Sequence, residues 1–268
     1  MCGSAQNGAR EAGTLHGAAP SGDRDRTGWG SQEMHTDTTK PLAPDAAPPV
    51  HHAPRGFSDR FALGVTRLLR LGADTLFAKR YGHRAIVLET VAAVPGMVGA
   101  TVTHLQCLRR MVDDDGWIRT LMEEAENERM HLMTFVALAK PTAFERLVIL
   151  LAQWIFYVGF FLLYLASRRT GHRLVGYFEE EAVLSYTLYL AEIDAGRSPN
   201  VAAPAIARQY WDLAADATLR DVVLAVRADE AHHRDVNHGL ASELDGQPPD
   251  RSHQATYPQR VDPRRRNA

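Results

Sequence analysis

The chain has 268 residues, a formal net charge of −2 at pH 7 and a sequence pI near 6.6. This length can bury a sizeable core in one domain, and the near-neutral charge gives no basis for a nucleic-acid partner. With only two cysteines, Cys2 and Cys107, the sequence indicates neither a disulfide framework nor a thiolate metal site.

Both ends of the chain are poor in bulky apolar residues. Residues 1–56 are rich in Gly, Ala, Pro and Asp, and residues 245–268 are rich in Pro, Asp and Arg. Such segments cannot bury enough apolar surface to offset the entropy lost on ordering. We therefore predict disordered ends and one helical domain over residues 57–244. The leader lacks both the apolar run of a secretory signal and a clear Arg-rich transit pattern.

The first predicted helix covers residues 58–79. Its apolar residues recur at helical spacing, while Arg60, Arg67 and Arg70 lie on the other side. A broad apolar face beside basic residues favours a helix that lies in a membrane interface. A solvent-facing helix of a bundle is the alternative.

The second predicted helix, residues 84–111, is apolar nearly all round. This pattern predicts a buried helix, with a kink at Pro95-Gly96. Glu89 lies inside the apolar run. Because an unpaired carboxylate is costly there, we expect Glu89 to be protonated, ion-paired or metal-bound.

The third predicted helix follows a turn signal at residues 113–116 and runs from Trp117 to Lys140, before a proline. It carries Glu128 and His131, and a separation of three residues places both side chains on one face. Three further glutamates nearby are interpreted as a solvated acidic face: Glu123, Glu124 and Glu126.

Residues 147–166 are the most apolar stretch, with Arg146 before it and Arg168-Arg169 after it. By hydropathy the stretch could span a bilayer. Three interpretations compete: one spanning helix, a core helix of a soluble bundle, or a helix embedded in one leaflet with arginines at the headgroups. Helices on both sides carry ligands for what we take to be one site. An odd crossing would separate them, which favours the one-leaflet interpretation.

Three more helices are predicted after the apolar stretch. They cover residues 172–195, a shorter segment at 201–213 and a long helix at 218–244. The last of these carries the pair His232-His233. If His233 points into the bundle, His232 is expected to point away from it.

Two Glu-x-x-His pairs occur, and each is preceded by a glutamate on an earlier helix. A four-helix bundle holds two metal ions with this ligand set. Four carboxylates balance two divalent ions, and oxygen and imidazole donors suit iron or manganese better than zinc. Six protein ligands leave positions open for dioxygen, which points to redox catalysis. The predicted ligands are Glu89, Glu128, His131, Glu179, Glu230 and His233.

Aromatic and polar residues near the ligands are candidates for supporting roles. Tyr186 lies seven residues, about two turns, after Glu179 and therefore on the same helix face. A tyrosine there could pass an electron and a proton to the metal centre; a hydrogen-bonded core tyrosine is the alternative. Four residues are expected to orient the ligands through hydrogen bonds: Asn127, Asp229, Tyr210 and Trp211.

Four motifs in order, at residues 88–97, 126–132, 179–182 and 227–234, resemble the alternative oxidases. The resemblance covers residues 59–240. It implies an all-α fold, a ferritin-like di-iron four-helix bundle with two additional amphipathic or apolar helices that form a monotopic membrane-binding face. It further implies a homodimeric ubiquinol oxidase on one leaflet of a lipid bilayer, which reduces dioxygen to water at two iron ions without pumping protons.

The resemblance also implies residue roles. The six ligands above carry over, and Tyr186 is the tyrosine near the metals. Phe178 replaces a usual leucine and Ser185 a common threonine, which would alter inhibitor fit more than chemistry. The regulatory cysteine of the plant enzymes has no secure counterpart, so regulation by 2-oxo acids is not expected. The implied quinol pocket consists of Arg84, Leu88, Glu181, Ala182, Ser185, Arg70 and His172.

Two alternative functions fit the same residues. One is another membrane di-iron enzyme, such as a quinone-ring hydroxylase or a plastoquinol oxidase; the other is a membrane-attached iron-binding or storage protein. The Ala- and Arg-rich composition and the missing transit pattern favour the cytoplasmic face of a bacterial inner membrane, or a mitochondrial inner membrane in a eukaryotic host.

Overall fold

The structure, a computed structural model, describes residues 52–77, 81–139 and 142–247. Within these ranges it is all-helical, with one isolated antiparallel bridge between Ala202 and Thr218 in place of any strand. The predicted fold class is confirmed. The two segments expected to be disordered fall mostly outside these ranges, since only residues 52–56 and 245–247 of them are described.

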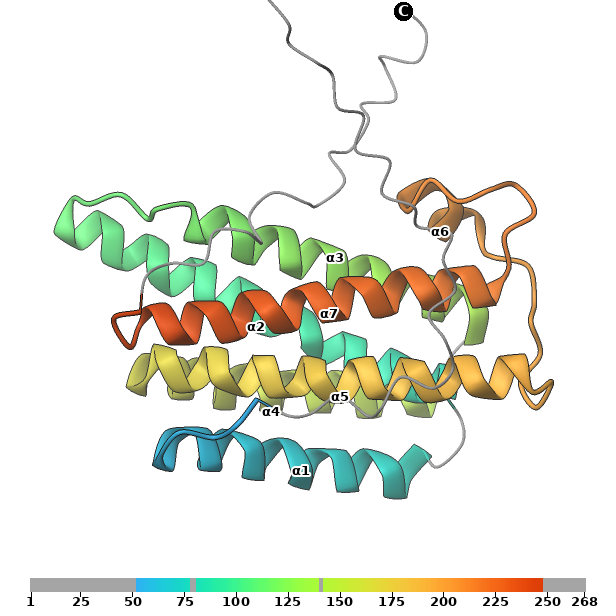
Figure 1. The fold of residues 1–268 in the computed structure, drawn as a ribbon, viewed down its shortest axis with the longest axis horizontal. Coiled ribbons are helices and arrows are strands. Elements are labelled where there is room, and N and C mark those ends of the chain that lie inside the picture. The colour runs from blue at the N-terminus through green and yellow to red at the C-terminus, as the bar shows by residue number, and fades with distance from the viewer. Residues whose placement is uncertain (1–51, 78–80, 140–141, 248–268) are drawn as a thin grey trace, which may run out of the picture. The chain divides into compact units, whose positions relative to one another are not determined.

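The helices start and end close to the predicted positions (Figure 1). The larger differences have local causes. The fourth helix begins before the apolar stretch because Thr142 and Glu145 form a capping box, and the fifth begins early because the Ser167 side chain accepts from the Thr170 amide. The helices of the described residues are α1 (Phe57–Phe77), α2 (Tyr81–Arg110), α3 (Trp117–Ala139), α4 (Ala143–Ala166), α5 (Arg168–Asp194), α6 (Ala205–Tyr210) and α7 (Leu219–Glu243).

The four helices α2, α3, α5 and α7 form a bundle around one core. The most extensive packing in the described ranges joins α2 to α3 and α5 to α7. One apolar cluster takes buried side chains from all four helices: Ile86, Phe135, Leu190 and Val226. Burial of each such side chain contributes roughly 1.5–3 kcal/mol. The bundle thus fixes the helices that carry the predicted ligands.

Two glycines allow the helix pairs to approach closely. A Cβ at Gly96 of α2 would lie 2.3 Å from the backbone oxygen of Leu121 on α3. A Cβ at Gly176 of α5 would lie 2.5 Å from the ring of His238 on α7. The α2 helix continues through Pro95. Of its apolar stretch, 61% is buried, as predicted for a core helix.

Helices α1 and α4 pack outside the four-helix core, α1 mainly on α5 and α4 on α2 and α5. By length and composition, α2 and α4 could each cross a membrane, but only 11% of the apolar stretch of α4 is buried. Trp154 and Ile155 are 62% and 74% exposed. The interpretation of α4 as the core helix of a soluble bundle is therefore wrong.

The arginines that follow α4 bind protein groups. Arg168 donates to Gln106 (2.9 Å) and Thr103 (3.1 Å), and its guanidinium lies 4.9 Å from the Trp117 ring centroid. Arg169 pairs with Asp59 of α1 at 2.8 Å. Both arginines therefore join the start of α5 to α1, α2 and α3, and their position at lipid headgroups stays a prediction.

Candidate metal centre

The six predicted ligands meet inside the four-helix bundle. Glu89 comes from α2, Glu179 from α5, and the two Glu-x-x-His pairs from α3 and α7. All six side chains are buried, with exposed fractions between 0% and 4%. Their donor atoms form two groups, each with all atoms within 4.8 Å of one another. The groups are Glu89, Glu128, His131 and Glu230, and Glu128, Glu179, Glu230 and His233.

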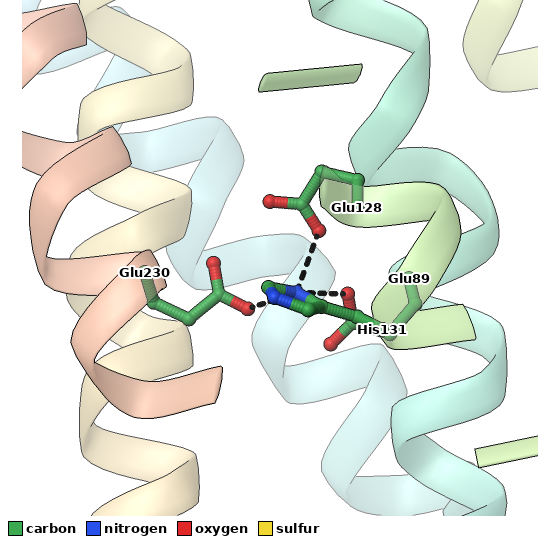
Figure 2. Close-up of side chains that lie close together, drawn as sticks. All are labelled: Glu89, Glu128, His131 and Glu230. Carbon is green, nitrogen blue, oxygen red and sulfur yellow. Dashed lines mark ion pairs between the residues drawn. The ribbon is translucent and has the colours of Figure 1, made fainter. Parts of the chain in front are cut away.

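Figure 2 shows the first group around the ring of His131. Its Nδ1 lies 3.4 Å from Glu89 Oε2, 3.3 Å from Glu128 Oε2 and 3.3 Å from Glu230 Oε1. In the second group, His233 Nδ1 lies 2.6 Å from Glu128 Oε1 and 3.5 Å from Glu230 Oε2. Glu128 and Glu230 thus lie between the two imidazoles and belong to both groups.

Three of the buried carboxyls of the cluster, Glu89, Glu128 and Glu179, have strongly shifted pKa values. Burial, followed by the charges of Glu230 and Glu128, raises the pKa of Glu89 and of Glu179 well above the ordinary value. Burial alone would also raise the pKa of Glu128, but His131 and His233 hold it well below that value. The cluster therefore requires positive charge from protons or cations.

Among the buried polar atoms that make no hydrogen bond to a described residue are five donor atoms of the predicted ligands. They are Glu89 Oε2, both Glu128 oxygens, His131 Nδ1 and Glu230 Oε2. An unsatisfied buried polar atom costs about 1–3 kcal/mol. Such atoms also occur elsewhere, for example at Thr134 and Arg173, but these five lie together in the cluster. Two divalent cations would satisfy them and balance four carboxylates. The residues present therefore fit a two-metal centre, with donors that suit iron or manganese.

The outer side of His131 is held by a hydrogen-bond network. His131 Nε2 lies 3.2 Å from Asp229 Oδ2, which also accepts from Asn127 Nδ2 (3.0 Å) and Trp211 Nε1 (2.8 Å). Asn127 Nδ2 also donates to the Tyr210 hydroxyl at 3.0 Å. A proton held on Nε2 turns the Nδ1 lone pair toward the centre. The hydrogen bonds predicted for these residues are present, and their role in orienting a metal ligand stays a prediction.

Tyr186 lies against the first group. Its hydroxyl donates to Glu89 Oε1, and its ring stacks on Phe135 with centroids 5.8 Å apart. Burial, followed by the nearby Glu89 charge, raises the pKa of Tyr186 well above its ordinary value. The tyrosine is thus a neutral donor at rest.

The structure corrects the expectation of a solvated acidic face on α3. Glu123 and Glu126 form partly exposed pairs with arginines on the same helix, but Glu124 is only 1% exposed. It accepts from Asn237 Nδ2 at 2.9 Å. Burial raises the pKa of Glu124 to about 7, although His233 opposes the shift. The sequence signal is its position four residues before Glu128, on the same helix face.

A cavity of about 420 Å³ lies among α1, α2, α4 and α5 and reaches the metal centre. Glu89, Glu179, Glu230 and Tyr186 line its inner part. The rest of the lining is mostly apolar and comes from α1, α2, α4 and α5. Some of its α1 and α4 residues are exposed at the surface, including Leu68 (68%), Leu69 (47%) and Ile155 (74%). The cavity therefore extends from the exposed apolar surface of α1 and α4 to the ligand cluster.

The family model described as alternative oxidase matches residues 43–242. The chain belongs to the alternative oxidase family. The resemblance carried by the sequence motifs is thereby confirmed, and the buried Glu/His cluster accords with a family of metal-binding helical bundles.

Curated alternative oxidase relatives are similar over most of this chain. The mitochondrial ubiquinol oxidase of Mangifera indica is 57% identical over 188 residues, which are 70% of this chain and 59% of the relative. Mitochondrial ubiquinol oxidase 2 of Arabidopsis thaliana is 56% identical over 197 residues, which are 74% of this chain and 56% of the relative. The mitochondrial ubiquinol oxidase of Batrachochytrium dendrobatidis is 52% identical over 215 residues, which are 80% of this chain and 67% of the relative. The chain thus spans under two thirds of the first two relatives.

Six of the seven positions that the alternative oxidase resemblance assigns to a quinol pocket line this cavity, and Phe178 lines it too. His172 does not. It lies elsewhere in the interior, with Nε2 2.9 Å from the Tyr164 hydroxyl and Nδ1 3.0 Å from Asn237 Oδ1. The six lining residues are Arg70, Arg84, Leu88, Glu181, Ala182 and Ser185.

Sequence reasoning missed Asp74 of α1. It pairs with Arg84 of α2 and, at 3.5 Å, with Arg70, whose guanidinium also pairs with Glu181 of α5. These ion pairs join three of the helices that surround the cavity. The available signal was the spacing of four residues between Arg70 and Asp74 on a predicted helix.

Proposed function

We propose that this chain is a membrane-bound ubiquinol oxidase that reduces dioxygen to water at two iron ions without pumping protons. The observation that carries the proposal is the cavity between the exposed apolar surface of α1 and α4 and the Glu/His cluster. A quinol dissolves in lipid, and a mostly apolar cavity with a few polar groups suits it. The ubiquinol oxidase names of the relatives support the same substrate.

The proposed iron ligands are the six cluster residues. Bound there, iron supplies the redox chemistry with dioxygen that side chains lack. Glu128 and Glu230 belong to both groups and would help to hold both ions. Asp229 holds the ring of His131 in the tautomer that a ligand needs.

The cavity residues are proposed to bind and orient the quinol. Arg70 and Arg84, each paired with carboxylates, present polar groups to its oxygens, whereas Leu88 and Ala182 contact its apolar part. Tyr186 lines the inner part of the cavity and donates to Glu89, so we assign it the transfer of an electron and a proton toward the centre.

The proton balance of the proposed reaction is compatible with the absence of proton pumping that we propose. Two quinols release four protons and four electrons, which is what one dioxygen requires to become two waters. No proton has to be taken from one side of the membrane and released on the other. The energy of the reaction is then released without charge transfer across the bilayer.

Attachment to one leaflet is proposed through α1 and α4. Ligands come from α2 and α3, before α4, and from α5 and α7, after it; one crossing by α4 would place them on opposite sides of the bilayer. The exposed apolar residues of α4, such as Trp154 and Ile155, suit the acyl region. We assign an inner membrane, bacterial as the composition favours or mitochondrial as the relatives' names indicate.

A homodimer is part of the same proposal. Exposed apolar side chains on α2 and α3, including Leu105, Leu108 and Met122, are available for a second copy. Sedimentation of the protein in mild detergent tests this. A dimer is expected, and replacement of Leu105 by Lys should shift it toward the monomer.

Oxygen uptake by isolated membranes tests the activity. We expect cyanide-insensitive uptake with ubiquinol and two irons per chain, both abolished by Glu128→Ala. Uptake that persists in an iron-free variant contradicts the proposal. Many irons per chain without quinol-dependent uptake would indicate storage, and labelled oxygen in the quinone product would indicate a hydroxylase.

A further inference from the structure

Four charged side chains from three helices form one connected network beside the cavity. Asp74 of α1 pairs with Arg84 of α2, and its Oδ2 lies 3.5 Å from Nε of Arg70 on the same helix. Arg70 in turn pairs with Glu181 of α5. Arg70, Arg84 and Glu181 line the cavity, whereas Asp74 is not among the lining residues. Asp74 can therefore act on a molecule in the cavity only through its neighbours.

The two arginines depend on Asp74 to different degrees. Arg70 has a second carboxylate partner, Glu181, so that loss of Asp74 would leave one ion pair in place. For Arg84, the residues that the structure describes provide one ion-pair partner, and this is Asp74. The side chain of Arg84 is only 12% exposed, and a largely buried guanidinium without a carboxylate partner is costly. Loss of Asp74 should therefore affect Arg84 most.

The pair with Asp74 also fixes the direction in which Arg84 presents its N–H groups. A guanidinium is planar and rigid, and its five N–H donors form one fork. Nη1 of Arg84 donates to Asp74 Oδ1, while Nε is buried and makes no hydrogen bond to a described residue. Because the plane is rigid, holding Nη1 orients the other donors as well. Arg84 thus keeps donor capacity that the described residues do not use, in a fixed orientation.

A second ion pair provides a comparison for one that only connects two helices. Asp194 of α5 lies 2.7 Å from Arg220, which belongs to α7, and these side chains are 46% and 36% exposed. Neither residue lines the cavity. Asp74 is exposed to a similar degree, 44%, but its partner Arg84 is largely buried and lines the cavity. The two pairs therefore differ in what the arginine faces, and not in the carboxylate.

We propose that Asp74 is a positioning residue for the quinol, because it holds the guanidinium of Arg84 in the orientation from which it donates to a ring oxygen. The inference rests on the proposed function, since it requires a quinol in the cavity. A ring oxygen accepts hydrogen bonds both in the quinol and in the product quinone, and a charged donor makes the stronger bond. Arg84 makes this bond, and Asp74 sets its direction.

Steady-state oxygen uptake by the iron-loaded full chain tests the inference, with ubiquinol that carries a single isoprene unit. Asp74→Asn keeps the size of the side chain but removes its charge. We expect KM to rise roughly 3- to 10-fold, the worth of about one hydrogen bond, while kcat stays unchanged because the ligands and Tyr186 are not altered. Asp74→Glu should recover part of the loss. Asp194→Asn, the matched control, should leave KM and kcat unchanged.

Calorimetric titration of two ligands, in detergent and under argon, separates orientation from general damage. One ligand is ubiquinone with a single isoprene unit, and the other is an analogue in which methyl groups replace both ring carbonyl oxygens. Asp74→Asn should bind the quinone roughly 3- to 10-fold more weakly and the analogue as tightly as wild type does. In a chain that carries Arg84→Met, Asp74→Asn should cause no further loss of quinone affinity.

The outcomes distinguish this inference from the proposed function. Unchanged KM and quinone affinity in Asp74→Asn overturn the inference alone, as does an equal loss of affinity for both ligands. An equal effect of Asp194→Asn also overturns it. A wild-type chain that neither binds ubiquinone nor oxidises ubiquinol overturns the inference together with the proposed function. Quinone binding that depends on Asp74, in a chain without quinol-dependent oxygen uptake, supports the inference and overturns the proposed function.

Discussion

The two halves of the metal centre contain the same ligand types but different outer partners. In the half formed by α2 and α3, Glu89 accepts from Tyr186, and His131 lies against Asp229, which Trp211 and Asn127 also contact. In the half formed by α5 and α7, Asn237 donates to the backbone carbonyl of His233 and to the buried Glu124, and its oxygen lies 3.0 Å from His172, which contacts Tyr164.

The difference shows which features of the site repeat and which do not. Metal binding requires the same donors in both halves, so the Glu-x-x-His spacing repeats. The outer partners depend on what each half packs against, which is α6 on one side and the start of α5 on the other. The same ligand types thus occur in both halves, whereas the hydrogen bonds around them come from different residues.

The largest expected effect comes from a ligand that both halves share. Glu128→Ala removes a carboxylate from both groups, so both irons and more than about 1,000-fold of quinol-dependent oxygen uptake should be lost. His131→Ala should first release one ion, because that ring belongs to one group. Metal analysis and an oxygen electrode measure both effects, with Glu123→Ala, a partly exposed site on the same helix, as the control.

The next largest effect on turnover is expected from Tyr186, which contacts the half of the centre formed by α2 and α3. Tyr186→Phe keeps the ring stacked on Phe135 but removes the hydroxyl that donates to Glu89. Turnover should fall by about 100-fold, as for loss of a proton-transfer group, while iron content stays at two per chain. Tyr177→Phe, which removes a hydroxyl bonded to the His52 carbonyl, should retain turnover. Normal turnover in Tyr186→Phe would favour the core-tyrosine alternative.

A smaller effect on stability is expected from two glycine substitutions, one between α2 and α3 and the other between α5 and α7. In Gly96→Ala the new methyl group meets the backbone of α3 at 2.3 Å, so the helices must separate, at a cost of about 1–3 kcal/mol. In Gly176→Ala it meets the His238 side chain at 2.5 Å, which can rotate. Urea unfolding should show the larger loss of unfolding free energy for Gly96→Ala; the reverse order would contradict this comparison.

The smallest expected effect concerns the contact between α1 and the second half. Burial alone would raise the pKa of Asp59, but hydrogen bonds from the Arg55 amide and Arg169, with the charge of Arg173, hold it below the ordinary value. Its stabilising contribution is therefore present above the unfolded pKa of about 3.9 and is lost as pH falls through the folded value.

Unfolding free energies measured between about pH 3 and pH 7 test this sign. The difference between wild type and Asp59→Asn should be largest near neutrality and shrink in acid. The exposed residue Asp216 offers a control, since Asp216→Asn should give a difference that is small at every pH. A difference that grows as pH falls would contradict the prediction.

The sequence by itself determined the helical order, the candidate ligands and the apolar character of α4. These features follow from spacing within single helices: a separation of three residues places Glu128 beside His131, and an unbroken apolar run marks α4. Helix ends were less predictable, because caps such as Thr142 and Ser167 depend on local bonds that spacing does not reveal.

Only the tertiary structure decided which groups are buried and what they contact. Glu123, Glu124 and Glu126 look alike in the sequence, yet only Glu124 faces α7, where it meets a residue 113 positions away. The same holds for His172, placed outside the cavity, and for Arg169, paired with Asp59. Periodicity indicates which residues share a helix face; burial and charge pairing depend on which distant helix packs against that face.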